Sequence, residues 1–423
     1  MNNKSVKKTV LAMIFAVLIY RALNAIPTPG VNADYFKSLM ESNESLGFLN
    51  SMTGGGLEDL SVMALGITPY ITATIIIQLL GVIFPRITDM QRGGAQERKA
   101  IDRINLILGE VLAFMQAFVM GLTFGQNGML VDSSMKCVIL IAAIWSTGTL
   151  ILALMGKHIQ DVYKLNGTSV ILTAGIIASW PSDAYILFSR LTGADHSVFR
   201  NVCCVTAAII LILLLFLFTI RSLKAEKKIP VVFSRAKSTG RDSSAMPLKL
   251  CPGSVVPIVF SSALIALPAL IAQMIGRGTD SMAVNILNSA NWLDPAHPVY
   301  SIGAAIYIGL IFFFSFYYNN VINNPIEIAN NFRKTGAAIP GVRAGKDTSD
   351  YIIRENRNVL ALGALALTLI AFLPIVLANI FSIPRISFLG TSVIITTGVV
   401  IEIRDTLKGK KIMHSYEERK ELF

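Results

Sequence analysis

The stretch SMTGGGLEDLSVMALGITPYITATIIIQLL, residues 51–80, begins with glycines and acids and ends as one of the most apolar runs in the chain. Its apolar part is long enough to cross a membrane as a helix, which takes about 20 residues for roughly 30 Å of hydrocarbon. Similar runs recur along all 423 residues, only 15% of which are charged, and the mean hydropathy is +0.60. The composition therefore predicts a polytopic membrane protein and excludes an ordinary soluble globule.

Ten apolar runs have the length of membrane-spanning helices, so the sequence predicts an all-α membrane protein with ten transmembrane helices. The first run has the basic start and short apolar core of a secretory signal peptide. Because nine further spans follow, we interpret it as the first helix of a bundle. The ten runs lie near residues 9–25, 62–84, 104–124, 136–156, 168–189, 201–220, 254–275, 298–318, 357–380 and 386–403.

Positive charge is distributed unevenly around these spans. With the N-terminus inside, 30 of the 37 Lys and Arg residues fall in cytoplasmic segments. The other side holds seven, at Arg21, Lys37, Lys136, Arg190, Arg200, Arg277 and Arg385. Since Lys and Arg gather on the cytoplasmic side, both termini are predicted to be cytoplasmic. The net charge of +11 is then concentrated on one face, where anionic lipids attract each nearby basic residue by about 1 kcal/mol.

Ten spans divide into two halves of five, residues 1–189 and 190–423. An odd number of spans per half means that the second half is inserted upside down relative to the first, and the interface between such inverted repeats is where transporters bind their substrates. The pattern leaves two classes of function open. One is a pore operated by a partner, and the other is a secondary transporter with five-plus-five repeats.

Two cytoplasmic connections, residues 221–253 and 319–356, are long and basic. The first contains IPVVFSR at 229–235, which predicts a β-hairpin. In the second, Pro325 can start a short helix that Gly336 ends, before a Pro-Gly turn.

The chain offers little chemistry of its own. Glu110 and Glu402 are the main candidates for ion coupling, but both lie close to the cytoplasmic face, where snorkelling or pairing explains them. The segment GVRAGKD, residues 341–347, lacks the spacing of a phosphate-binding loop. The four cysteines form no CxxC pair and the four histidines are scattered, so we expect no metal and no cofactor. These features favour a passive pore over an enzyme.

Six stretches, in chain order, resemble motifs of the SecY family, the central subunits of the bacterial protein-conducting channel. They are IPTPG (26–30), GGGLEDLSVMALGITPYITATIIIQLL (54–80), NGTSVILTAGIIA (166–178), MPLKLCPGSVVPIVFSSAL (246–264), FYYNNVINNPIEIANNFRKTGAAIPGVRAGK (316–346) and LGTSVIITTGVVIE (389–402). The resemblance implies two inverted five-helix halves around a central pore, with a lateral gate formed mostly by the second and seventh helices. It also implies a function, which is to move unfolded, signal-bearing preproteins across the bacterial cytoplasmic membrane and to release apolar segments sideways into it.

The resemblance further implies a ring of apolar side chains at the waist of the pore. Such a ring resists water and ions by dewetting, yet adapts to any passing side chain because it makes no directional bonds. Thr168 departs from the pattern, because a polar residue stands where an aliphatic one is usual. The alternative is that these side chains merely pack helices together. The implied ring residues are Ile67, Ile71, Thr168, Leu172, Val259 and Ile395.

The opening stretch corresponds, on this resemblance, to a plug near residues 48–62, a short helical segment beneath the ring that moves away when a chain enters. Glycines ease bending but raise the entropic cost of order, so we expect the closed position to be only marginally favoured. The acids are expected to face an aqueous outer funnel. A flexible external loop is the alternative. The implied plug residues are Ser51, Gly54, Gly55, Gly56, Glu58 and Asp59.

The two basic loops match the family's docking surfaces for the ATPase SecA and for the ribosome. Their arginines could contact carboxylates of SecA or phosphates of ribosomal RNA, while a solvated loop on the positive side is the alternative. Ala344 replaces a usual proline beside this surface. Small subunits of the SecE and SecG type are implied partners, and an accessory channel for a few dedicated substrates is a narrower alternative. The implied docking residues are Lys227, Lys228, Arg235 and Arg343.

Overall fold

The computed structural model has ten helices of 16 or more residues in the part of the chain that it describes, and each overlaps one predicted span. These helices are α1 (Asn3–Asn24), α4 (Thr68–Ile83), α6 (Ala95–Gln126), α7 (Met135–Tyr163), α8 (Gly167–Leu191), α9 (Val198–Lys224), α10 (Val256–Met274), α12 (Ser301–Ile322), α14 (Lys346–Phe381) and α15 (Leu389–Glu421). The structure describes residues 3–31, 53, 55–57, 59–126, 128, 130, 132, 134–163, 165–191, 198–233, 244–253, 255–274, 282–293, 297–322, 325–381 and 389–421.

Five of these helices are, within the described residues, long and apolar enough to cross a membrane by themselves. A sixth span results if α4 is joined to α5 (Pro85–Arg92) across a sharp bend of 119°. The protein is thus a helical, multi-pass membrane protein, and the count of ten spans remains a prediction. The remaining short helices are α11 (Met282–Leu287), α13 (Pro325–Thr335) and the 3₁₀ turns Ser289–Asn291 and Pro298–Tyr300.

Several helices extend beyond the predicted spans on the side of the basic loops. The third span was predicted from residue 104, whereas α6 begins at Ala95. The Glu97 carboxylate accepts a hydrogen bond from the Gly94 N–H at 2.8 Å, which satisfies one of the free donors at the start of this helix. These polar turns are helical without being apolar, so hydropathy gives no sign of them.

The two basic loops meet in one small sheet of order β2-β1-β3. Strand β1 (Glu226–Phe233) pairs antiparallel with β2 (Ser244–Lys249), which confirms the predicted hairpin. Its other edge pairs with β3 (Ala337–Ala338) from the second loop. As predicted, α13 begins at Pro325, and Gly336 follows its end with a φ of +68°. A small core of Ile229, Leu248, Ile339 and Ile352 fastens this sheet to α14.

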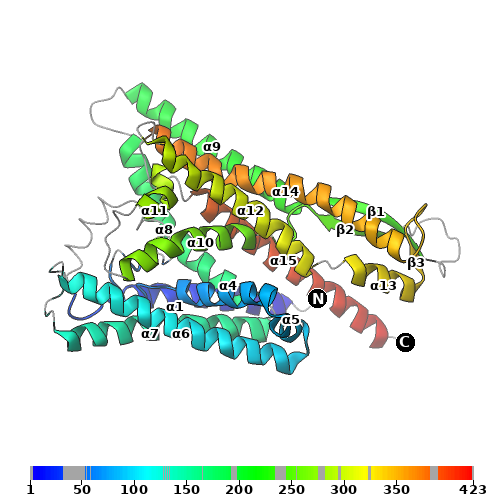
Figure 1. Ribbon diagram of the computed structural model, residues 1–423, viewed down its shortest axis with the longest axis horizontal. Coiled ribbons are helices and arrows are strands. Elements are labelled where there is room, and N and C mark those ends of the chain that lie inside the picture. The colour runs from blue at the N-terminus through cyan, green and yellow to red at the C-terminus, as the bar shows by residue number, and fades with distance from the viewer. Residues whose placement is uncertain are drawn as a thin grey trace.

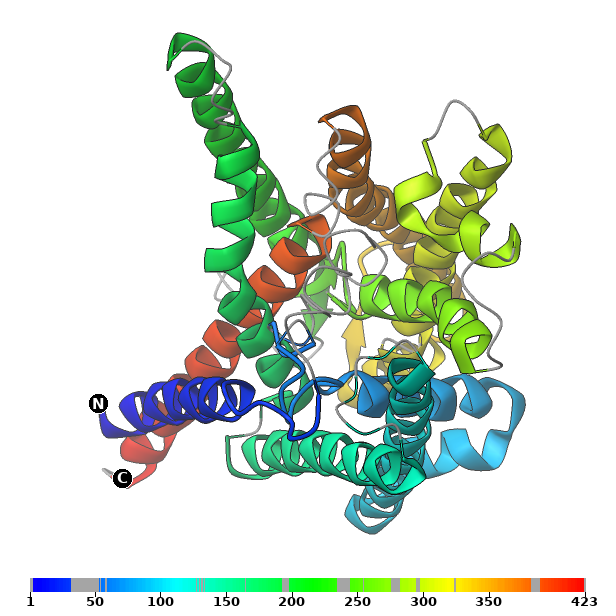
Figure 2. The ribbon, with the colours of Figure 1, turned by 90° about the vertical axis from the view of Figure 1, so that its left-hand side faces the viewer.

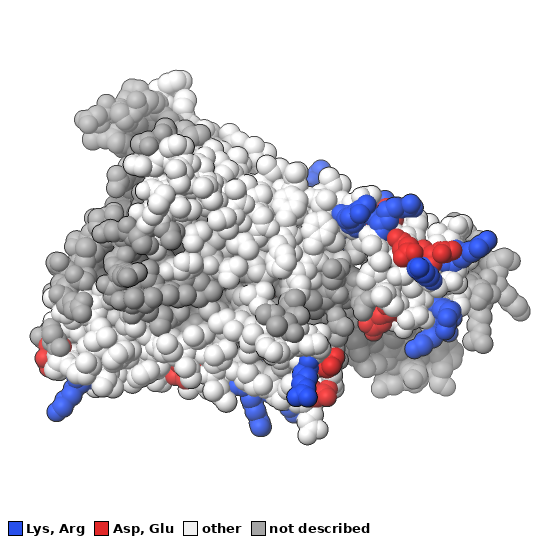
Figure 3. Space-filling view, in the orientation of Figure 1, with Lys and Arg blue, Asp and Glu red and all other residues white. Residues whose placement is uncertain are grey.

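Figure 1 shows the sheet, α13 and the C-terminus at one end of the molecule, with the N-terminus between the centre and that end. On the face drawn in Figure 3, lysines and arginines gather with acidic residues at that same end, further charged residues lie along the lower edge, and the broad surface between them is almost uncharged. Figure 2 looks at the opposite end, where the ends of helices surround the centre of the molecule. The main hydrophobic core is shared by the two halves, since it includes Ile71 and Leu172 from one and Ile258 and Ile395 from the other.

Candidate pore and docking surface

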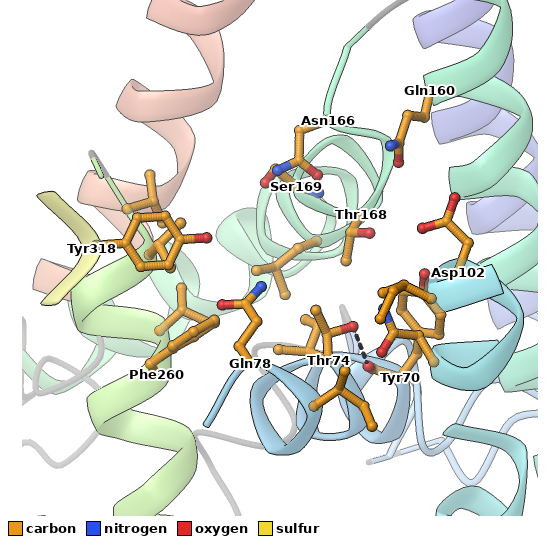
Figure 4. Close-up of a pocket in the computed structure, with 18 of the residues that line it drawn as sticks. Tyr70, Thr74, Gln78, Asp102, Gln160, Asn166, Thr168, Ser169, Phe260 and Tyr318 are labelled. Carbon is orange, nitrogen blue, oxygen red and sulfur yellow. Dashed lines mark hydrogen bonds between the residues drawn. The ribbon is translucent and has the colours of Figure 1, made fainter. Parts of the chain in front are cut away.

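A cavity of about 730 Å³ lies between the two halves. Part of its wall is polar and comes from the loop-side ends of α5, α6 and α7, with Gln91, Arg98, Asp102, Gln160 and Asp161. Figure 4 shows Asp102 and Gln160 on one side of this space, with Phe260 and Tyr318 across from them. Water can hydrogen-bond to this polar part of the wall, so the cavity can stay hydrated there.

Five of the six predicted ring residues line this cavity. Ile71 comes from α4, Thr168 and Leu172 from α8, Val259 from α10 and Ile395 from α15. The sixth, Ile67, does not belong to the lining, and it is buried with 2% of its surface exposed just before α4 begins. The fold therefore brings aliphatic side chains from four helices and both halves around a single space.

The start of α8 is held in place from both sides. A Cβ atom at Gly167 would overlap the carbonyl group of Gly156, so the backbones of α7 and α8 touch at this crossing. The Asn166 side chain accepts a hydrogen bond from the Ser169 N–H at 3.3 Å. Glu402 of α15 accepts another from the Asn166 N–H, also at 3.3 Å. A carboxylate at a helix N-terminus is favourable, so Glu402 has a pairing role here.

Glu110 lies away from the cavity, because it is not among the lining residues. Its Oε2 atom is buried and has no hydrogen-bond partner in the described part of the chain. In the same part of the chain, no group of His, Cys, Asp and Glu residues is arranged to hold a metal ion.

The segment before α4 differs from the predicted short helix. Thr53, Gly55–Leu57 and Asp59–Ile67 form a succession of turns, whereas Ser51, Gly54 and Glu58 lie outside the described residues. Three positive φ angles, +88° at Gly55, +44° at Leu60 and +56° at Gly66, prevent a continuous right-handed helix. The predicted second span therefore starts later, at Thr68.

This segment is also anchored more firmly than its glycines suggest. Leu57, Leu60 and Met63 are buried, with at most 2% of each exposed. Asp59 is exposed, in keeping with an acid that faces water. Several hydrogen bonds join the segment to the C-terminal part of α1, to the residues that follow α1, and to α7. They are Tyr20 Oη to Thr53 O (2.7 Å), Ser61 Oγ to Asn24 Oδ1 (2.9 Å), Thr28 N to Leu60 O (3.0 Å), Val62 N to Ile26 O (3.0 Å) and Thr149 Oγ1 to Gly66 O (3.0 Å).

Gly56 explains part of this anchoring. A Cβ atom there would overlap Asn24 Oδ1 and lie 3.0 Å from both Ser61 Oγ and Met63 O. The sequence suggested that these glycines serve flexibility, but at this position the absence of a side chain allows close packing.

The predicted docking residues lie on the sheet end of the molecule. Lys227 and Lys228 are exposed on β1, and Arg343 is exposed in the turn before α14, while Arg235 falls outside the described residues. Lys227 is already paired with Glu355 of α14, Nζ to Oε2 at 2.5 Å. That hydrogen bond and the carboxylate charge raise the pKa of Lys227.

The family model for SecY matches residues 61–404. The chain belongs to the SecY family. It is 31% identical to the protein translocase subunit SecY of Staphylococcus carnosus, covering 98% of this chain and 96% of that one. It is 32% identical to the SecY translocase subunit of Bacillus subtilis, covering 98% and 97%.

Solved structures share the SecY fold. A structure described as a protein-conducting channel matches with a TM-score of 0.63 at 17% identity, over 95% of this chain and 91% of that one. A structure of Sec61 in the canine ribosome-channel complex from the endoplasmic reticulum matches with a TM-score of 0.60 at 15% identity, over 95% and 91%. The all-helical channel fold expected from the sequence is therefore confirmed.

Two features of this SecY-family site were not predicted from the sequence. One is the hydrogen bond from Tyr317 of α12 to Gln78 of α4, and the other is the pairing of β3 with β1. Both join segments far apart in the chain. No local motif predicts them, although the tyrosine pair at 317–318, at the end of a predicted membrane span, was a possible signal.

Proposed function

We propose that this protein is the pore-forming subunit of a protein-conducting channel in a bacterial cytoplasmic membrane. It moves unfolded preproteins across the membrane and releases sufficiently apolar segments sideways into lipid. The observation that carries this function is the combination of SecY family membership over residues 61–404 with one cavity bordered by aliphatic side chains from four helices. The chain supplies a path, and the proposal assigns it no catalytic step.

The cavity suits a polypeptide substrate for a physical reason. Its polar wall allows an entering chain to keep its water, and its aliphatic wall closes around side chains of any kind without specific bonds. An apolar segment gains free energy by leaving such a space for hydrocarbon, while a polar segment continues through water. The anchored turns at Thr53, Gly55–Leu57 and Asp59–Ile67 come just before Ile71 of the cavity wall in the sequence and serve, in this proposal, as the resting plug.

The proposed partners follow from the charged end of the molecule. Basic residues on the joined loops provide a surface for a translocation ATPase of the SecA type and for the ribosome, through acidic side chains or RNA phosphates. Support comes from the related Sec61 fold seen in a ribosome-channel complex. The C-terminus lies at this end and the N-terminus on the same side of the centre, which supports cytoplasmic termini. Small SecE and SecG type subunits complete the proposed assembly.

Reconstitution tests the function directly. Vesicles that contain the purified protein, SecE and SecG type subunits, SecA and ATP should protect a signal-bearing preprotein from added protease. Accumulation of a small solute in the same vesicles, with no protected preprotein, would instead favour a secondary transporter. In that case Glu110→Gln should abolish solute uptake, whereas we expect it to leave preprotein transport nearly unchanged, because Glu110 does not line the cavity.

Reversing the charge of Arg343 tests the docking surface. The Arg343→Glu variant should slow SecA-driven transport about tenfold or more at limiting SecA, because a charge-assisted hydrogen bond contributes about 1.5–3 kcal/mol and the new carboxylate repels acidic groups. Lys408→Glu makes the same charge change on the exposed part of α15 and should have little effect. Equal transport rates in the two variants would show that Arg343 does not contribute to SecA docking.

Lys227 is expected to contribute less to docking than Arg343, because its ammonium group is already paired within the chain. Lys227→Met should therefore reduce SecA-driven transport less than Arg343→Glu does. Glu355→Gln frees the Lys227 charge and should not slow docking. A larger defect in Lys227→Met than in Arg343→Glu would show that the partner breaks the ion pair and uses Lys227 directly.

A further inference from the structure

One hydrogen bond joins the two halves across the wall of the cavity. Tyr317 Oη of α12 donates to the main-chain oxygen of Gln78, near the end of α4, at 3.2 Å. Both residues line the cavity. Helix α4 packs mainly on α6 and α5 of its own half, and α12 packs mainly on α10 and α14 of the other. The hydrogen bond thus lies where α4 and α12 themselves make few other contacts, next to the packing of α6 on α10.

Aromatic neighbours fix the position of the tyrosine hydroxyl. The Tyr317 ring stacks on Phe313, with centroids 6.2 Å apart and an interplanar angle of 5°. The next residue, Tyr318, meets Phe260 of α10 edge to face at 5.9 Å. Figure 4 shows the Gln78 side chain turned toward Tyr318 and Phe260. These contacts hold the hydroxyl against α4 and reduce the entropy that the hydrogen bond must overcome.

Another hydrogen bond joins the halves elsewhere on the cavity wall, from the Asn166 N–H of the first half to Glu402 of α15. There, however, α8 and α15 also pack extensively against each other. Separating the two halves would therefore break more packing contacts at α8 and α15 than between α4 and α12. Helices α4 and α12 share few contacts, and α6 and α10 supply the neighbouring contacts between the halves, so the Tyr317 hydrogen bond is a defined interaction on a sparsely packed seam.

We propose that Tyr317 is a specificity-determining residue for sideways release, an inference that rests on the proposed function. Its hydroxyl keeps α4 and α12 together until an entering segment is apolar enough to offset the broken hydrogen bond. A neutral hydrogen bond contributes about 1 kcal/mol, which corresponds to about a fivefold change in a population ratio. Tyr317 thereby helps to set how apolar a segment must be before it leaves the channel for lipid.

The test compares two tyrosines of the same helix. Tyr317→Phe removes the hydroxyl and keeps the stacked ring. Tyr307→Phe is the matched control, because the Tyr307 hydroxyl lies 3.3 Å from Ser262 Oγ of α10, within one half. Vesicles with the complete channel, SecA and ATP receive preproteins whose membrane segment carries a graded number of Leu→Ala changes. Protease protection then gives the fraction of each segment that is released into lipid.

For a borderline segment, the ratio of released to translocated chains should rise about fivefold in Tyr317→Phe and stay at the wild-type value in Tyr307→Phe. A merely destabilised channel would lower both products without changing their ratio. Wild-type ratios in Tyr317→Phe, or the same rise in both variants, would overturn the proposal.

A second measurement does not depend on transport. Spin labels on cysteines at Asp89 of α5 and Glu327 of α13, which are both exposed, report the separation of the halves in the substrate-free channel. Tyr317→Phe should enlarge the long-distance population about fivefold, and Tyr307→Phe should not. If distances shift but no preprotein moves, the hydrogen bond holds the halves while the proposed function fails. If preprotein moves and neither distances nor release change, the role of Tyr317 fails alone.

Discussion

Gly56→Ala is expected to make the resting channel leak ions at a rate more than tenfold above that of the unchanged protein. The added Cβ would overlap Asn24 Oδ1 and crowd Ser61 Oγ, two atoms that anchor the segment before α4. Overpacking of this kind costs about 2 kcal/mol, which changes a population ratio roughly 25-fold. Gly56 has no positive φ, so the effect arises from contact and not from backbone strain.

Ion flux through vesicles that contain the purified channel and no preprotein measures this leak. Gly309→Ala is the control, because Gly309 lies on α12 with open space around the position that a Cβ would take. An ion-tight Gly56→Ala channel would show that the segment from Thr53 to Ile67 does not seal the resting pore.

Gly167→Ala is expected to lower the thermal stability of the whole protein sharply. The three atoms nearest to a Cβ at this position all belong to the Gly156 backbone, which cannot rotate away as a side chain would. We expect a cost of about 3 kcal/mol or more. Because α8 carries Thr168 and Leu172, its displacement should also open the aliphatic wall of the cavity.

The same helix crossing provides the control. A Cβ at Gly156 would meet its nearest atoms at 3.3–3.4 Å, a distance that small shifts can relieve. In detergent, the unfolding midpoint of Gly167→Ala should therefore fall much further than that of Gly156→Ala. Equal midpoints would mean that α7 and α8 do not depend on this contact.

Hydropathy predicted where the helices lie because each membrane span needs an apolar run of similar length. It failed at polar helix turns, as at Ala95, and at apolar residues that are buried by protein instead of lipid. Val62–Ile67 is an example of the second kind, since Met63 and Leu65 are buried among neighbouring elements while the backbone only turns. Composition cannot distinguish an apolar residue that packs on protein from one that faces lipid.

Motifs predicted five of the residues that line the cavity, Ile71, Thr168, Leu172, Val259 and Ile395, but none of its polar wall. Contacts between distant segments were not predicted. Strand β1 pairs with the two-residue strand β3, and Tyr317 bonds to Gln78. Both contacts depend on how distant segments pack together, which the residue pattern of a single segment does not show. Gly56 was assigned to flexibility for the same reason, since Asn24 lies 32 positions earlier in the sequence.

The sheet that joins the two basic loops has a mechanical consequence. Because β3 is paired to β1 and Ile352 of α14 is buried beneath them, a partner that pulls on either loop loads both. Helix α14, which carries Ile352 near its start, has 36 residues in all and is about 54 Å long at 1.5 Å per residue. A continuous helix is stiffer than a loop. We therefore expect a force applied to the sheet to displace α12 and α15, which pack on α14.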